Sequence, residues 1–355
     1  MQKALGLAAL LLSVLAVGAQ TVDTNNAAVP HLPPSAKIIT FDPPNSFATY
    51  PTAINDPGQV VGSYSDGTVF LGFVRSSTGV FTSFNVVGSA NTVPVGINAS
   101  GEIAGYYADS SNMSHGFVRE PSGSIITFDP PGSTSTTVFS INSFGQVAGT
   151  YTNVVAQSFI RDRRGNFTTF TIPGATSSYA LAISEDGSVT GYYFSAGRQS
   201  ARGFERDSSG GIMTFDAPGA GVGAGQGTVP VAINQKNQIA GISISSKNFL
   251  HGFSRDSAGV FTVVSDPDAY KGPGGVGTAP TFLNNNGEIV GYVQNPTGNF
   301  GFSVDTLLNY TTIKVPGSVS GRSRVGTLPT GINNSGTITG SYQDVKRMTH
   351  GFIRF

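Results

Sequence analysis

The sequence predicts an all-β protein, a seven-bladed β-propeller with four antiparallel strands per blade, in which the N-terminal strand closes the last blade. Three observations support this prediction. The composition is that of a turn-rich β protein, with 47 Gly, 20 Pro, 24 Phe and only 11% charged residues in 355. One four-strand unit recurs seven times along the chain. The seventh copy lacks its fourth strand, and a matching strand precedes the first copy.

The first half of each unit predicts a hairpin of fixed length. It begins with an apolar residue, usually followed by Asn, then a polar turn and, eight residues after the apolar residue, a Gly. The apolar residues are Ile54, Ile97, Ile141, Ile183, Ile233, Leu283 and Ile332, and the glycines are Gly62, Gly105, Gly149, Gly191, Gly241, Gly291 and Gly340. Because this spacing never changes, we expect two short strands joined by a tight turn.

The second half of each unit predicts another hairpin. Its third strand carries Phe73, Phe117, Phe159, Phe204, Phe253, Phe302 or Phe352, and eleven residues after the first six come Phe84, Phe128, Phe170, Phe215, Val264 and Ile313. The residues between are polar and mostly include Gly, which is typical of turns. Each unit therefore holds two hairpins in 42 to 50 residues, the size of a propeller blade.

The two chain ends are predicted to share one unit. The seventh unit stops at Phe355, three residues after its third-strand Phe352. Residues 38–41 resemble the fourth strands of the other units, and Phe41 precedes Ile54 by 13 residues, as Phe84 precedes Ile97. We therefore expect residues 38–41 to complete the last unit and to remove an open sheet edge.

The repeat resembles that of the extracellular HAF-type repeat proteins of bacteria. That family combines an Ile-Asn-x-x-Gly-x-Ile-x-Gly motif with a His-small-Phe motif, which stands here as His115-Gly116-Phe117, His251-Gly252-Phe253 and His350-Gly351-Phe352. The resemblance covers residues 37–355. It implies a secreted repeat fold and carries no specific activity.

The N-terminal residues predict export. Residues 1–19 combine Lys3, an apolar stretch and a small-residue exit ending at Ala19, as expected of a signal peptide; a retained membrane anchor is the alternative. Residues 20–36 predict a flexible linker and residues 37–355 the propeller. Without Cys, the chain has no disulfides or thiolate metal sites. We expect a secreted monomer, periplasmic or extracellular, with no membrane attachment once the signal is removed.

Charge disfavours polyanionic partners. The chain has 20 basic and 20 acidic residues and no basic stripe, so we expect no binding to nucleic acid or to anionic membranes.

The innermost strands predict a channel without catalytic groups. They contain no Asp, Glu, His, Lys or Arg and read PTAIN, PVGIN, VFSIN, ALAIS, PVAIN, PTFLN and PTGIN. We therefore expect no catalytic residues, metal or cofactor there. His115, His251 and His350 share one repeat position but belong to distant units, which favours local hydrogen bonding over a shared metal ion. The recurring third-strand Arg residues are expected to make local ion pairs.

The longest connections between units predict a binding site. From the fourth-strand residue to the next Ile or Leu the spacing is 13 in four cases and 18 or 19 in three consecutive ones, which lengthens loops 216–232, 265–282 and 314–331. Loops on a rigid scaffold commonly carry binding residues. The candidate ligand-binding residues are Asp266, Asp268, Tyr270, Lys271, Arg322 and Arg324. Solvated loop tips without a ligand are the alternative interpretation.

The favoured function is a secreted, non-catalytic propeller that binds a glycan or a protein partner through the face carrying these long loops. A polysaccharide lyase or hydrolase with a loop-borne site is one alternative, for which Asp266 and Asp268 are the obvious carboxylates. A structural extracellular repeat protein with no ligand is the other.

Overall fold

The computed structural model describes residues 36–269, 277–294, 298–319 and 326–355, and in this part of the chain it contains 28 strands and no helix. The strands form seven four-strand units. Unit 1 comprises β2 (Ala48–Ile54), β3 (Val60–Ser65), β4 (Phe70–Arg75) and β5 (Phe81–Phe84). Unit 2 comprises β6 (Asn91–Ile97), β7 (Ile103–Ala108), β8 (Ser114–Arg119) and β9 (Ile125–Phe128). Unit 3 comprises β10 (Ser135–Ile141), β11 (Val147–Thr152), β12 (Ala156–Arg161) and β13 (Phe167–Phe170).

The remaining units follow the same plan. Unit 4 comprises β14 (Ala175–Ile183), β15 (Val189–Ser195), β16 (Arg198–Arg206) and β17 (Ile212–Phe215). Unit 5 comprises β18 (Gly227–Ile233), β19 (Ile239–Ile244), β20 (Leu250–Arg255) and β21 (Phe261–Val264). Unit 6 comprises β22 (Thr278–Leu283), β23 (Ile289–Val293), β24 (Phe300–Val304) and β25 (Tyr310–Ile313). Unit 7 comprises β26 (Thr327–Ile332), β27 (Ile338–Gln343), β28 (Thr349–Arg354) and β1 (Ile38–Phe41).

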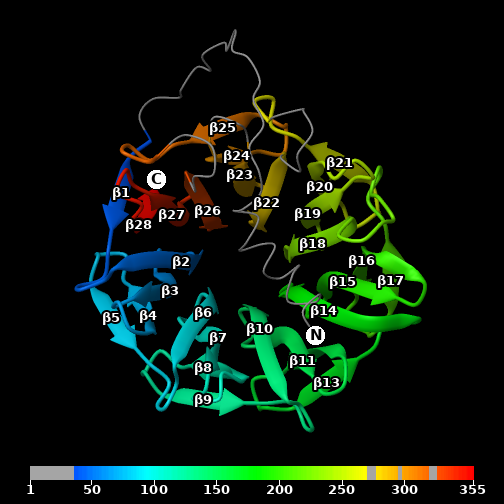
Figure 1. Ribbon diagram of the computed structural model, residues 1–355, viewed down its shortest axis with the longest axis horizontal. Coiled ribbons are helices and arrows are strands. Elements are labelled where there is room, and N and C mark those ends of the chain that lie inside the picture. The colour runs from blue at the N-terminus through cyan, green and yellow to red at the C-terminus, as the bar shows by residue number, and fades with distance from the viewer. Residues whose placement is uncertain (1–35, 270–276, 295–297, 320–325) are drawn as a thin grey trace.

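The units stand in a circle, with their first strands nearest the axis and their fourth strands at the periphery (Figure 1). β1 pairs antiparallel with β28 from Ile38 opposite Arg354 to Phe41 opposite Gly351. The N-terminal strand therefore completes the last unit, as the sequence predicts. The architecture is all-β and propeller-like.

The predicted seven blades are not seven separate sheets, because the seven four-strand units hydrogen-bond into five sheets. None of the five closes on itself among the described strands. Units 1 and 2 are joined by one parallel pair, Phe70 with Asn91, and units 4 and 5 by another, Ala201 with Gly227. Glycine makes the second junction possible, because a Cβ on Gly227 would overlap the carbonyl oxygen of Ala201.

The glycine eight residues after each Ile or Leu anchor is required by close packing in the first hairpin. In all seven units a Cβ there would overlap a backbone carbonyl of the first strand. At Gly191, for example, it would overlap the carbonyl oxygen of Tyr179. The sequence spacing therefore reports a close backbone approach in addition to a turn.

Neighbouring units pack through third-strand Phe and Arg side chains. Of the third-strand Phe rings, six are fully buried and Phe253 is nearly so. Five Arg guanidinium groups lie 4.7–5.2 Å from the centroid of a fourth-strand Phe of the preceding unit: Arg75 over Phe41, Arg119 over Phe84, Arg161 over Phe128, Arg206 over Phe170 and Arg255 over Phe215. Such cation–π contacts tie one unit to the next.

These contacts correct the expectation of local ion pairs. Of the six recurring third-strand Arg residues, only Arg255 has an ion pair in the described structure, at 2.8 Å from Glu205. Arg75, Arg119, Arg161 and Arg206 donate to backbone instead, as when Arg161 Nη1 bonds the carbonyl of Asp162 at 3.2 Å. Because the guanidinium is flat and weakly hydrated, an aromatic face satisfies it without a carboxylate.

The two ends of the units differ in their loops. The first-to-second and third-to-fourth strand turns lie at one end, here called the turn face, and all thirteen contain five residues. The remaining connections lie at the other end, here called the connection face, because antiparallel strands alternate in direction. There the three predicted long loops are confirmed at 216–226, 265–277 and 314–326. The other four connections from a fourth strand to the next first strand contain four to six residues.

Among the described residues, no helix is long and apolar enough to cross a membrane.

Candidate functional site

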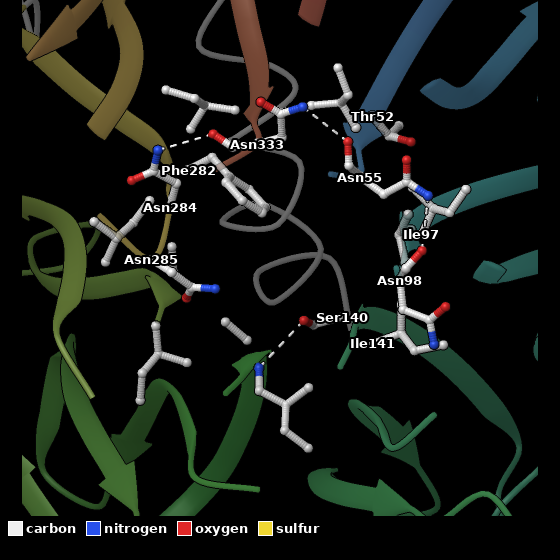
Figure 2. Close-up of a pocket in the computed structure, with 18 of the residues that line it drawn as sticks. Thr52, Asn55, Ile97, Asn98, Ser140, Ile141, Phe282, Asn284, Asn285 and Asn333 are labelled. Carbon is white, nitrogen blue, oxygen red and sulfur yellow. Dashed lines mark hydrogen bonds between the residues drawn. The ribbon is translucent and has the colours of Figure 1, made fainter. Parts of the chain in front are cut away.

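A cavity of about 330 Å³ lies on the axis where the first strands end at the turn face (Figure 2). All seven first strands contribute the last apolar residue before the turn, and the turns contribute polar side chains. This volume is at the lower end of the range for ligand-binding pockets.

A β-bulge in every first strand helps to form the cavity wall. The pairing register shifts by one residue in all seven inner hairpins, for example between Pro51 and Ala53. A bulge leaves one residue unpaired and re-aims its side chain. The residues at these bulges all line the cavity: Thr52, Val95, Phe139, Leu181, Val231, Thr281 and Thr330.

The bulge residues make the cavity two-sided. At the bulge positions the adjacent units 6, 7 and 1 contribute Thr281, Thr330 and Thr52, whereas units 2 to 5 contribute apolar side chains. Thr281 and Thr330 each donate to a carbonyl of the next unit at 2.9 Å, which leaves the hydroxyl oxygen free to accept. The ring of Phe282 extends toward the middle of the cavity (Figure 2). The wall can therefore contact polar and apolar parts of one ligand.

The Asn of the Ile-Asn motif forms a ring of hydrogen bonds around the cavity mouth. Each Asn donates its side-chain amide to the backbone carbonyl of the corresponding residue in the next unit, at 2.9–3.2 Å. The donors are Asn55, Asn98, Asn142, Asn234, Asn284 and Asn333. Asn333 donates to Asn55, so the ring runs from the last unit to the first. Figure 2 draws the bonds donated by Asn284, Asn333 and Asn55.

The same Asn side chains also fix the turns. In each of these six units, Asn Oδ1 accepts the backbone N–H of the residue four positions later, as in Gln59 N–H to Asn55 at 2.8 Å. One buried amide therefore caps its own turn and binds the next unit. We call this set of bonds the amide ring.

The amide ring is interrupted between units 4 and 5, where Ser184 replaces Asn. The Ser184 hydroxyl bonds Asp186 in its own turn. Asp186 in turn accepts from Asn237 of unit 5 at 3.0 Å, which provides a different link across this boundary. Burial would raise the pKa of Asp186, but hydrogen bonds from Asn237, Ser184 and Ser188 outweigh it and lower the pKa to about 2.

Two carboxylates line the cavity at the turns, Asp56 in unit 1 and Glu185 in unit 4. Asp56 accepts the backbone and side-chain N–H groups of Asn334, both at 2.8 Å, and Glu185 accepts from the backbone and hydroxyl of Ser143. These carboxylates correct the expectation of a channel without acid or base groups, because the turns after the inner strands place two of them at the mouth. Asp56 directly follows the inner-strand segment PTAIN and Glu185 directly follows ALAIS, so both belong to the turns at the cavity mouth.

The structure describes two of the six predicted ligand-binding residues. Asp266 is 2% exposed, and its Oδ1 accepts the backbone N–H of Asp268 at 2.8 Å, so it caps its own loop. Burial raises its pKa, and its Oδ2 has no hydrogen-bond partner in the described structure. Asp268 is exposed. The other four, Tyr270, Lys271, Arg322 and Arg324, lie outside the described residues.

The long connections are anchored at both described ends. Near its start, each has a backbone N–H bonded to a Thr hydroxyl of the following strand, as in Asp266 to Thr278 at 2.9 Å. Each also ends in a glycine on which a Cβ would overlap a carbonyl of the preceding unit: Gly227, Gly277 and Gly326. The described ends of these connections are therefore held against the neighbouring strands.

The repeated histidines make hydrogen bonds, as the sequence analysis expects, at two of three positions. His115 Nδ1 lies 2.7 Å from Asp129 and its Nε2 lies 3.5 Å from Asp109. His350 lies between Asp42 and Asp344 in the same way, whereas His251 is exposed. Both ring nitrogens face carboxylates, which leaves neither directed at a metal. Among the described residues no group of three or more His, Asp and Glu side chains is arranged to hold a metal ion.

Comparison with known proteins supports the fold and leaves the function open. No protein-family model and no curated protein matches the chain. Its structure is similar to virginiamycin B lyase from Staphylococcus aureus, with a TM-score of 0.59 and 13% identity over 90% of this chain and 100% of that one. A streptogramin B lyase gives 0.57 and 11% identity, over 90% and 98%.

A prolyl endopeptidase is also similar, with a TM-score of 0.58 and 10% identity over 84% of this chain and 47% of that one. All three identities are too low to carry more than the fold. The similarity supports a propeller-like fold, and function has to be inferred from the site.

Proposed function

We propose that this chain is an exported, non-catalytic, seven-bladed β-propeller that binds a glycan at the mouth of its axial cavity. The observation that carries the proposal is the two-sided cavity on the turn face. A sugar ring offers hydroxyl groups on its edges and C–H groups on its faces, and both have counterparts in this wall.

The polar side of the cavity suits sugar hydroxyls. Asn285 and Asn334 line the mouth on this side with side chains that can donate and accept, and Thr52, Thr281 and Thr330 line the same part of the wall. The apolar side suits the C–H faces, because Val95, Leu181 and Val231 present only carbon. A volume of about 330 Å³ accommodates the end of a glycan.

The rigid surroundings also favour binding. The amide ring and the constant five-residue turns hold the mouth in one shape. A preformed site loses little conformational entropy when its ligand binds, which raises affinity for a given set of contacts.

Obstruction of the mouth tests the proposal. Ala99 is an exposed turn residue that lines the cavity, so Ala99→Trp places a bulky side chain over the mouth without burying it. Ala196 is an equally small, exposed residue on the connection face, and Ala196→Trp is the matched control. The purified wild type and both variants would be screened on a glycan array, and hits would be measured by isothermal titration calorimetry.

We expect Ala99→Trp to weaken binding at least tenfold, about 1.4 kcal/mol, with Ala196→Trp unchanged. Loss of binding in Ala196→Trp alone would place the site on the connection face. In that case the long loops 216–232, 265–282 and 314–331, with Asp266, Asp268 and the other predicted residues, would be the binding surface. Shortening loop 265–277 to six residues would test that second location.

A polysaccharide hydrolase or lyase is the second candidate, because Asp56 and Glu185 line one cavity. Carboxylate pairs perform general acid and base catalysis on glycans. Mass spectrometry of glycans incubated with the protein distinguishes the two functions. Turnover that is lost in both Asp56→Asn and Glu185→Gln would establish an enzyme, whereas intact glycan after binding supports the non-catalytic proposal.

A further inference from the structure

The turns of the turn face are rich in carboxylates. Its first turns contain five carboxylates and one cation: Asp56, Glu102, Glu185, Asp186, Glu288 and Lys236. Its second turns contain five more carboxylates and two cations: Glu120, Asp162, Asp207, Asp256, Asp305, Arg163 and Arg164. The net formal charge of these turns is −7 in a chain whose net charge is zero. Half of all acidic residues therefore lie on the face where the cavity opens.

Most of these carboxylates lack a cationic partner within the protein. In the described structure the one ion pair among them joins Glu102 to Arg163 at 2.8 Å. The others bond neutral groups that stabilise the ionised form. Hydrogen bonds from Asn166, Ser209 and Asn309 lower the pKa values of Asp162, Asp207 and Asp305, in that order. These carboxylates are therefore ionised at neutral pH. Six third strands end in Arg at the same face and offset most of their charge, so the uncompensated negative charge is local to the cavity mouth.

The cavity mouth follows the same pattern. Asp56 and Glu185 receive hydrogen bonds from Asn334 and Ser143, which are neutral, so neither charge is cancelled. The residues that line the cavity in the described structure include no Lys, Arg or His. A ligand that enters meets uncompensated negative charge in two units, 1 and 4.

From this charge distribution we propose that the cavity selects glycans that carry free ammonium groups, an inference that rests on the proposed glycan-binding function. The sugar hydroxyls and C–H faces contact the two-sided wall, and a protonated amine lies against Asp56 or Glu185. The two cavity carboxylates attract cationic ligands and repel uronic acids and sulfated sugars. A neutral sugar makes the contacts with the cavity wall but has no ammonium group to contact Asp56 or Glu185.

The test compares two oligosaccharides that differ only in charge. A glucosamine oligomer with free amines and its fully N-acetylated counterpart would be titrated into the purified protein by calorimetry, at 50 mM and 500 mM NaCl and at pH 6. The variants are Asp56→Asn and Glu185→Gln, which keep their size and an acceptor oxygen. Glu120→Gln, in a second turn of the same face and away from the cavity lining, is the matched control.

We expect the free-amine oligomer to bind about tenfold more tightly than the acetylated one at low salt, with the difference falling about threefold or more at high salt. Asp56→Asn or Glu185→Gln should lower affinity for the free-amine oligomer about three- to tenfold and leave the acetylated oligomer unaffected. Glu120→Gln should change neither.

The outcomes separate this inference from the proposed function. Equal binding of both oligomers, without salt dependence and without an effect of Asp56→Asn or Glu185→Gln, would overturn the charge selection and keep a glycan site. Failure of both oligomers to bind, in a wild type that binds another neutral or acidic glycan at the mouth, would likewise overturn the selection. If no glycan binds the wild type, the proposed function itself fails. A free-amine preference that Glu120→Gln reduces as much as Asp56→Asn would show a general surface attraction and would also overturn the cavity assignment.

Discussion

The turn face and the connection face are built from the ends of the same strands, yet their side chains are bonded differently. At the turn face one residue type repeats, and six Asn side chains bond the backbone of the next unit. At the connection face the bonds differ between units, and each joins a third strand to the connection that leaves its own unit: His115 bonds Asp129, His350 bonds Asp42, and Arg198 bonds Asp216.

The difference follows from the acceptor. A backbone carbonyl is present in every unit whatever its residue, so one Asn per unit is enough to continue the amide ring. A side-chain pair needs two matching residues and is lost when either changes. The turn face accordingly keeps one turn length, whereas connection-face loops range from two residues at 196–197 to thirteen at 265–277.

The largest expected effect is the loss of an amide-ring bond. Asn333→Ala removes the bond from the last unit to Asn55 and the cap on the N–H of Thr337, leaving buried groups without partners. We expect the free energy of unfolding to fall by about 3 kcal/mol, measured by urea denaturation. Asn153→Ala, at an exposed connection-face residue, should cost less than about 0.5 kcal/mol. Equal costs would show that the amide ring does not hold the units together.

A connection-face pair should contribute less. Asp216 accepts from Arg198 at 3.1 and 3.2 Å and from Arg202 at 3.2 Å, and all three side chains are partly exposed. Asp216→Asn should lower the free energy of unfolding by about 1 kcal/mol, and less in 1 M NaCl. A loss as large as that of Asn333→Ala would remove the contrast between the two faces.

The gap in the amide ring offers a gain in stability. Ser184→Asn supplies the missing amide, which can donate to the carbonyl of Asn234 as its counterparts do in the other units. We expect an increase of about 0.5–1 kcal/mol in urea denaturation. A decrease would show that the link between Asp186 and Asn237 already satisfies this boundary and leaves no room for the amide.

The smallest expected effect is a pH-dependent contribution of His115. Burial lowers its pKa, but hydrogen bonds and charge attraction from Asp129 and Asp109 outweigh this and leave the pKa raised. Its contribution to stability is therefore complete below the ordinary His pKa of about 6.5 and is lost as pH rises through the raised value.

His115→Gln should therefore cost more at pH 5.5 than at pH 8.5, with a difference below about 1 kcal/mol because the site is partly exposed. His251→Gln is the matched control, since His251 is exposed and has no ion pair in the described structure. The same pH dependence in both variants would contradict the role of the Asp residues.

Much of the fold could be predicted because the repeat constrains it locally. The spacing of eight from Ile54 to Gly62 fixes a hairpin, and the truncated last unit predicts the pairing of residues 38–41. The junctions between units could not be predicted, because they depend on how closely backbones approach. Gly227 meets Ala201 across a boundary that no local pattern encodes.

The candidate site was harder to predict. Because the inner strands contain no charged residue, the sequence predicted a binding site on the long loops instead. Asp56 and Glu185 were missed because they look like ordinary turn residues. Their position at the cavity depends on the direction of the chain after each inner strand. The one sequence signal available was the excess of acidic residues in the turns, summed over all units.

The sequence by itself determined the four-strand unit, its number of copies and the sharing of one unit by the chain ends, because strand period, turn chemistry and glycine spacing act over a few residues. Only the tertiary structure decided what the Asn of each unit does, since its hydrogen-bond acceptor lies more than 40 residues away in the next unit. It also decided where the cavity opens and which carboxylates line it. Those properties depend on seven distant segments meeting around one axis, and no single segment contains them.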